Sequence, residues 1–122
     1  MRLALESDPS IHLVRSYGEG VITVGAQELR GPCVIAPHGL LTEWSATSVD
    51  ELTEPQFAML LTMPANIVLL GTDAAAQWPP AAIRAWCHSK GIALETMNLG
   101  AACRTYNILA SEQRAVVAGL FP

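Results

Sequence analysis

The chain has 122 residues, of which 51% are hydrophobic and only 15% are charged, and its formal net charge is −4. This length allows one domain with a single hydrophobic core and excludes two independent cores. The seven basic residues stand singly along the chain. A surface that follows phosphates needs clustered Lys and Arg, so nucleic-acid binding is not expected.

The N-terminal sequence MRLALESDPS carries one Arg, a short apolar patch and two early acidic residues, which does not match a signal peptide. The apolar run Ile67–Leu70 is far too short to cross a bilayer. Three cysteines, an odd number without CxxC spacing, indicate neither a disulfide framework nor a zinc site. We therefore expect a soluble, cytoplasmic protein with three free thiols, of which Cys33 and Cys87 are more buried than Cys103.

Residues 1–10 are expected to form a flexible lead, and residues 11–122 a single α/β domain. The glycines of Tyr17–Gly20 favour a hairpin, because glycine adopts positive φ at little cost. The β-branched run that follows favours an extended strand. Further strands are predicted at Cys33–Ala36 and over Leu41–Trp44. The first half of the chain is thus predicted to be hairpin-rich and all-β.

A helix is predicted after Thr53, whose hydroxyl suits an N-cap position, with Pro55 in its first turn. Phe57, Leu60 and Leu61 follow at spacings of three and four residues. This periodicity places them on one apolar face of the helix.

A parallel unit is predicted in the second half. Ile67–Gly71 is a short, continuous apolar run, typical of a strand covered on both faces. A second helix begins at Pro80 and ends at Gly91, which suits the C-cap, and Ile92–Met97 forms the next strand. A strand, a helix and a strand of these lengths predict a crossover between parallel strands.

A third helix over roughly Ala101–Ser111 and a last strand over Ala115–Phe121 close the chain. The expected fold class is therefore α/β, with a mixed β-sheet, a hairpin-rich N-terminal half and a parallel βαβ C-terminal unit.

Polar residues and glycines follow the two predicted parallel strands. Ligands bind at the carboxyl ends of such strands, where helix N-termini present free N–H groups that attract anions. Arg104, expected in the first turn of the third helix, can add a bidentate contact to a carboxylate or phosphate. We predict a crevice that holds both Gly71 and Gly100. Its candidate lining residues are Gly71, Thr72, Asp73, Asn98, Gly100, Arg104, Thr105 and Asn107.

Two other interpretations of these residues stay open. Asp73, Thr105 and Asn107 also suit helix caps or loop contacts, and Arg104 can pair with Glu95 or Glu112 on the surface. A contact with a protein partner is the third interpretation. The segment after Gly71 lacks the lysine of a P-loop, and the chain contains no GxGxxG.

No catalytic residue, metal ligand or cofactor is assigned. Cys103 is expected near a helix N-terminus beside Arg104, and both features lower the pKa of a thiol. The three histidines, His12, His38 and His88, are bases in principle. They stand at no diagnostic spacing from the cysteine and form neither an HxH nor an HExxH set.

Three segments together resemble a small single-domain family of unknown function: Ile67–Thr72, Gly91–Met97, and Ala102–Asn107 followed by Leu109. The family occurs in bacteria, archaea and mitochondria, and its mitochondrial member is an assembly factor of respiratory complex I. The resemblance covers roughly Ile11–Pro122. It implies a three-layer fold with a mixed sheet and a β-hammerhead-like N-terminal part.

The resemblance implies a non-catalytic binding or assembly-helper domain, with a respiratory-complex subunit as a possible partner. The alternative is a small-molecule (anion) binding protein, or an undescribed enzyme, that uses the crevice around Thr72, Arg104 and Asn107. The family commonly has Gly-Thr-Gly after the first parallel strand, whereas Asp73 here replaces the last glycine. This replacement adds a negative charge where an anion would bind. The oligomeric state is left open.

Overall fold

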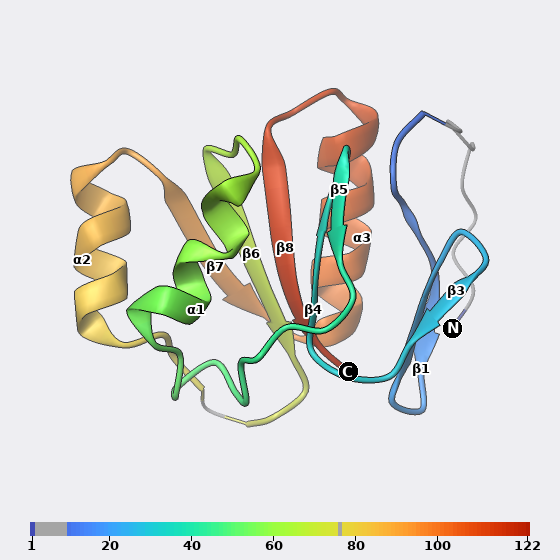
Figure 1. The fold of residues 1–122 in the computed structure, drawn as a ribbon, viewed down its shortest axis with the longest axis horizontal. Helices are drawn as coiled ribbons and strands as arrows, with labels where there is room; N and C mark the ends of the chain where they lie inside the picture. Colours follow the sequence, from blue (N-terminus) through green and yellow to red (C-terminus); the bar gives the residue numbers. More distant parts are fainter. Residues whose placement is uncertain (2–9, 76) are drawn as a thin grey trace.

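A mixed five-stranded β-sheet of order β5-β4-β8-β6-β7 forms the centre of the fold (Figure 1). The computed structural model describes residues 1, 10–75 and 77–122. The strands of this sheet are β4 (Cys33–Ala36), β5 (Gly39–Leu41), β6 (Ile67–Thr72), β7 (Ala93–Met97) and β8 (Val116–Phe121). All six residues of β8 are buried, as expected for the middle strand.

The predicted parallel unit is confirmed. The helix α2 (Ala81–Ser89) connects β6 to β7, and these two strands pair in parallel. On its other edge β6 pairs in parallel with β8, and β8 pairs antiparallel with β4. The sheet is therefore mixed because the N-terminal half contributes the antiparallel strands β4 and β5.

A separate small sheet holds the predicted hairpin. Its three antiparallel strands, in the order β1-β2-β3, are β1 (Val14–Gly18), β2 (Val21–Val24) and β3 (Gln27–Leu29). The turn between β1 and β2 has positive φ at Gly18, Glu19 and Gly20. The strand β3 was not predicted, because Gln and Glu have little preference for strands and its pairing with β2 comes from the tertiary fold.

The strand expected over Leu41–Trp44 is wrong in its position. The structure has β5 three residues long, ending at Leu41, and Trp44 lies in a loop as a buried core residue. Its indole Nε1 donates a 3.0 Å hydrogen bond to the Gln56 carbonyl, as a buried Trp requires. The ring lies over Gly119, where a Cβ would come within 2.8 Å of it.

The elements form three layers. On one face of the large sheet lie α1 (Glu54–Ala58), the 3₁₀ helix η1 (Leu60–Thr62) and α2. On the other face lie α3 (Leu99–Ser111) and the small sheet (Figure 1). Because side chains alternate across a strand, Val68 and Leu70 of β6 pack towards α1 and α2, and Leu69 packs towards α3.

Two helix starts follow from capping side chains. Thr53 and Gln56 form a reciprocal capping box that begins α1. The sequence predicted the Thr53 cap but not the return hydrogen bond to Gln56. Asn98 caps α3 by accepting a 2.8 Å hydrogen bond from the Ala101 N–H. The third helix therefore begins at Leu99, two residues earlier than expected, and this places Arg104 in its second turn.

The side chain of Asn107 joins α3 to the small sheet. It is only 4% exposed, its Oδ1 accepts a 2.9 Å hydrogen bond from the Val14 N–H, and its Nδ2 donates a 2.9 Å hydrogen bond to the Val14 carbonyl. The neighbouring Tyr106 hydroxyl donates to the His12 carbonyl at 2.8 Å. Two consecutive residues of α3 thus satisfy the backbone of the edge strand β1 and of the segment before it.

The flexible lead expected over residues 1–10 falls largely on residues 2–9, which lie outside the described residues. Of the helices that the structure describes, none is both long and apolar enough to cross a membrane.

We expect Asn107→Ala to lower the free energy of unfolding by about 2–4 kcal/mol, because it leaves a buried N–H and a buried carbonyl of Val14 without partners. Urea denaturation monitored by circular dichroism measures this change. Asn66→Ala, at an exposed position, is the matched control and should change stability by less than about 0.5 kcal/mol. A loss below about 1 kcal/mol for Asn107→Ala would show that the contact between α3 and β1 does not depend on this amide.

Candidate functional site

The carboxyl ends of β6 and β7 lie side by side, as the crossover predicted. Gly71 of β6 is in register with Met97, the last residue of β7, and α3 begins two residues after Met97. An ideal Cβ built on Gly71 would lie 3.5 Å from the Cα of Leu99. Gly71 and Gly100 therefore lie at the same end of the sheet, as expected, whereas the crevice that they were expected to line stays a prediction.

These two glycines allow close packing between elements. A Cβ on Gly71 would lie 2.5 Å from the Cβ of Ala102, so α3 approaches β6 more closely than any side chain would permit. A Cβ on Gly100 would lie 2.6 Å from the hydroxyl oxygen of Tyr17, so the Tyr17 ring of β1 lies directly against the first turn of α3. Both glycines are buried as a result.

The N-terminus of α3 receives a carboxylate from within the chain. Asp73 accepts a 3.1 Å hydrogen bond from the Leu99 N–H through its Oδ1. A negative charge here is favourable because the N–H groups of the first turn lack helical partners and the helix dipole is positive at this end. Asp73 thus occupies the position where an external anion was predicted.

Thr72 also bonds within the chain, because its hydroxyl oxygen accepts a 3.1 Å hydrogen bond from the Ala74 N–H. Thr105 is half-buried on α3. Asn107 does not line this edge, which corrects its place in the predicted crevice. It lies in the third turn of α3, on the face towards β1, and both polar atoms of its amide are bonded to Val14.

Arg104 is the one exposed cation among the candidate residues. Its Nη1 donates a 2.7 Å hydrogen bond to the Tyr17 hydroxyl, so its partner is a neutral group of the small sheet. Within the described part of the chain no ion pair joins it to Glu95 or Glu112. Its expected position in the first turn of the helix was wrong, since the Asn98 cap begins α3 earlier.

Cys103 differs from both expectations about it. It is 0% exposed, as is Cys33, so it is not the more accessible thiol. Burial raises the pKa of the Cys103 thiol to about 12, and the nearby Cys33 raises it further, whereas Arg104 lowers it by less. A buried thiol that stays protonated is not a nucleophile at neutral pH.

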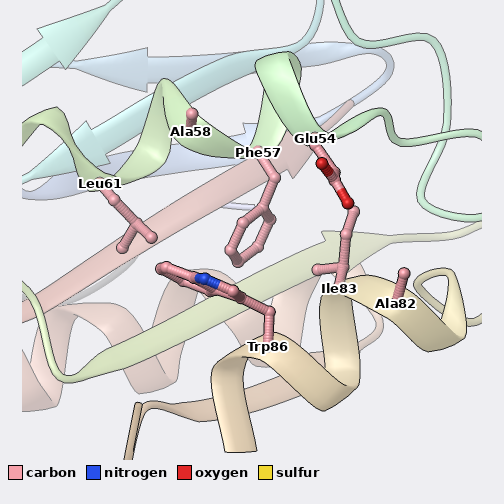
Figure 2. A pocket seen from close by; sticks show the side chains of 7 residues that line it. All are labelled: Glu54, Phe57, Ala58, Leu61, Ala82, Ile83 and Trp86. Atoms are coloured by element: carbon pink, nitrogen blue, oxygen red, sulfur yellow. The ribbon is translucent and has the colours of Figure 1, made fainter. Parts of the chain in front are cut away.

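A hollow between α1 and α2 is a feature that the sequence did not reveal (Figure 2). Its volume is about 310 Å³. The residues that line it are Glu54, Phe57, Ala58, Leu61, Ala82, Ile83 and Trp86. The ring of Trp86 stands edge-on to that of Phe57, with 6.5 Å between the ring centroids, and Trp86 is still 44% exposed.

The apolar spacing of Phe57, Leu60 and Leu61 was visible in the sequence, but the position of α2 beside them was not. In the folded chain Trp86 lines the hollow between the two helices and stays partly uncovered. Over the described stretches of the chain, no three His, Cys, Asp or Glu side chains gather closely enough to hold a metal ion.

The family model of a protein of unknown function (DUF498/DUF598) matches residues 14–121. The chain is 30% identical over 123 residues to the Bos taurus NADH dehydrogenase (ubiquinone) 1 alpha subcomplex assembly factor 3. This match covers 98% of the chain. This chain spans 66% of the length of that relative.

Two solved structures share the fold. A Xanthomonas campestris protein solved by NMR is 34% identical, with a TM-score of 0.79, and the match covers 99% of this chain and 92% of that one. A Bordetella pertussis protein, described as a Mth938-like domain, is 26% identical, with a TM-score of 0.75 over 100% of this chain and 92% of that one. These similarities agree with the three-layer α/β architecture.

Arg104→Ala should change the free energy of unfolding by less than about 1 kcal/mol, because the residue is exposed and loses one hydrogen bond to Tyr17. Thermal unfolding followed by circular dichroism provides the measurement. Tyr17→Phe is the matched control, since it removes the same hydrogen bond, together with the one that the hydroxyl donates to the Met1 sulfur, and keeps the ring over Gly100. A drop of many degrees with Arg104→Ala alone would reveal a structural role that Tyr17 does not explain.

The buried thiols predict a specific labelling pattern. At pH 8 iodoacetamide should label Cys33, Cys87 and Cys103 only after unfolding in urea, because all three are buried and burial raises the pKa of each thiol. Mass spectrometry of intact protein counts the labels. Rapid labelling of native Cys103 would contradict its burial.

Stability should fall at alkaline pH for the same reason. Burial raises the folded-state pKa of Cys33 and of Cys103 to about 12, above the ordinary value of 9.0. Their protonated thiols therefore contribute in full to the free energy of unfolding below pH 9, and this contribution is lost as the pH rises towards 12. The urea midpoint should decline over this range. Cys103→Ala should decline less steeply than the wild type, and equal slopes would contradict the assignment.

Proposed function

The chain belongs to the DUF498/DUF598 family, and we propose that it is a non-catalytic protein-binding domain that helps to assemble a respiratory complex. The observation that carries this proposal is the similarity to a protein named as an assembly factor of NADH dehydrogenase, which extends over 98% of this chain. A respiratory-complex subunit is the proposed partner. The proposal keeps the cytoplasmic location expected from the sequence.

The distribution of polar and apolar groups supports binding to a protein. At the sheet edge, Thr72, Asp73 and Asn98 are hydrogen-bonded within the chain. By contrast, three of the five large apolar side chains that are exposed in the described part of the chain lie on or beside α1 and α2, namely Met59, Trp78 and Trp86, while Met1 and Ile108 lie elsewhere. Exposed apolar groups that gather on one part of a surface are typical of protein-interaction sites.

The alternative function, anion binding around Thr72, Arg104 and Asn107, stays a prediction with less support. Asp73 brings a negative charge to the helix start, and the Asn107 amide is bonded to β1. Arg104 is the one charged residue of the three. It is exposed, and among the described residues it has no carboxylate partner.

Affinity capture tests the proposed function. The full chain is tagged and expressed near its natural level in cells of its source organism, and co-purifying proteins are quantified by mass spectrometry against cells with the tag alone. We expect NADH dehydrogenase subunits to be enriched several-fold. Deletion of the gene should reduce the assembled complex on native gels. Absence of enrichment together with normal assembly would overturn the proposal.

A further inference from the structure

We propose that the hollow between α1 and α2 docks an amphipathic helix of a partner protein, with two large apolar side chains one turn apart and a Lys or Arg beside Glu54. The inference rests on the proposed protein-binding function and identifies the surface that would carry it. Figure 2 shows Phe57 and Leu61 reaching from the α1 side towards Trp86, which rises from α2.

The lining favours apolar side chains of a protein. Six of the seven lining residues are apolar, and Glu54 is the only charged one. Trp86 presents 44% of its surface to solvent, and half-covered aromatic side chains are typical anchors of protein interfaces. The volume of about 310 Å³ is at the small end of ligand pockets and suits one or two large side chains better than a nucleotide cofactor.

The shape favours a helix as the occupant. Both walls are helical and present residues one turn apart, Phe57 and Leu61 on one side, and Ile83 with Trp86 on the other. Side chains of a third helix at positions i and i+4 match this spacing, as in known helix-in-groove complexes. Ala58 and Ala82 are exposed on the rims, and their small side chains allow a helix backbone to approach closely.

The charge at one end of the hollow selects a basic side chain. Glu54 is exposed there, and Asp50 and Glu51 are exposed just before α1. Among the residues that the structure describes, none of these three carboxylates forms an ion pair. Glu54 also favours the N-terminus of α1, but no basic residue lines the hollow to neutralise it. A Lys or Arg on the partner would be complementary to this acidic end.

The probe is a synthetic, stapled amphipathic helix of about four turns with Leu and Phe at i and i+4 and two Lys at one end. It is titrated into ¹⁵N-labelled full-length protein and followed by NMR. We expect chemical-shift changes confined to α1 and α2, including the indole N–H of Trp86. No binding at millimolar peptide, or changes centred on α3 or the small sheet, would overturn the inference.

Matched variants sharpen the test. Ala58→Arg fills the hollow without removing a core contact and should weaken binding at least about 10-fold, a change of ~1.4 kcal/mol. Ile108→Arg, at a 59% exposed position on α3, places the same side chain on the opposite face and should have no effect. Equal affinity for both variants and the wild type would contradict docking in the hollow.

A charge exchange tests the basic contact. A peptide with Glu in place of the two Lys should bind about 2–5-fold more weakly, as expected for an exposed pair, and Glu54→Lys should reverse this preference. Glu112→Lys, beyond the end of α3, is the control and should leave it unchanged. Two results together would overturn the helix inference: peptide affinities that do not change with these charges, and equally tight binding of free N-acetyl-tryptophanamide. They would show that the hollow binds small apolar molecules.

The two proposals fail in different ways. If the wild type and Ala58→Arg capture the same respiratory-complex subunits in cells, the assembly function stands and the docking surface is wrong. If the peptide binds as described but the wild type captures no such subunit, the surface stands and the assembly function is wrong.

Discussion

One buried amide, that of Asn107, joins the helix α3 to the small three-stranded sheet. It satisfies both the N–H and the carbonyl of Val14, which belongs to the edge strand β1 and would otherwise leave two polar groups unpaired in an apolar core. Because the amide sits in the middle of α3, it sets the distance between this helix and the small sheet. The contacts of Tyr17 with Gly100 and with Arg104 depend on that distance.

Ligands of α/β folds bind at the carboxyl ends of the parallel strands. In this protein, residues at that end of the sheet are largely used for internal contacts. Asp73 bonds to the first N–H of α3, and Gly71 lets the helix lie against β6. These contacts stabilise the same helix start that would otherwise attract an external anion. Polar residues that look like a binding motif in the sequence therefore act as caps and joints between the elements.

The opposite face of the large sheet is covered less completely. The helix α1 has only five residues and continues as a 3₁₀ turn, and α2 has nine. Two such short helices cover Phe57 and Ile83 but leave Trp86 partly in solvent. Exposed apolar patches on folded proteins often mark protein-interaction sites, and this agrees with the proposal that a partner covers the hollow.

Local signals in the sequence determined the hairpin after Tyr17, the parallel pair Ile67–Gly71 and Ile92–Met97, and the start of α1 at Thr53, because turns, caps and periodicity act over a few residues. Only the tertiary structure decided the rest. Asn107 meets Val14 across 93 positions and Arg104 meets Tyr17 across 87. The burial of Cys103 and the hollow beside Trp86 depend equally on how separate elements pack. Contacts between residues so distant in the chain leave no local pattern, since each partner alone is compatible with a surface position or a core position.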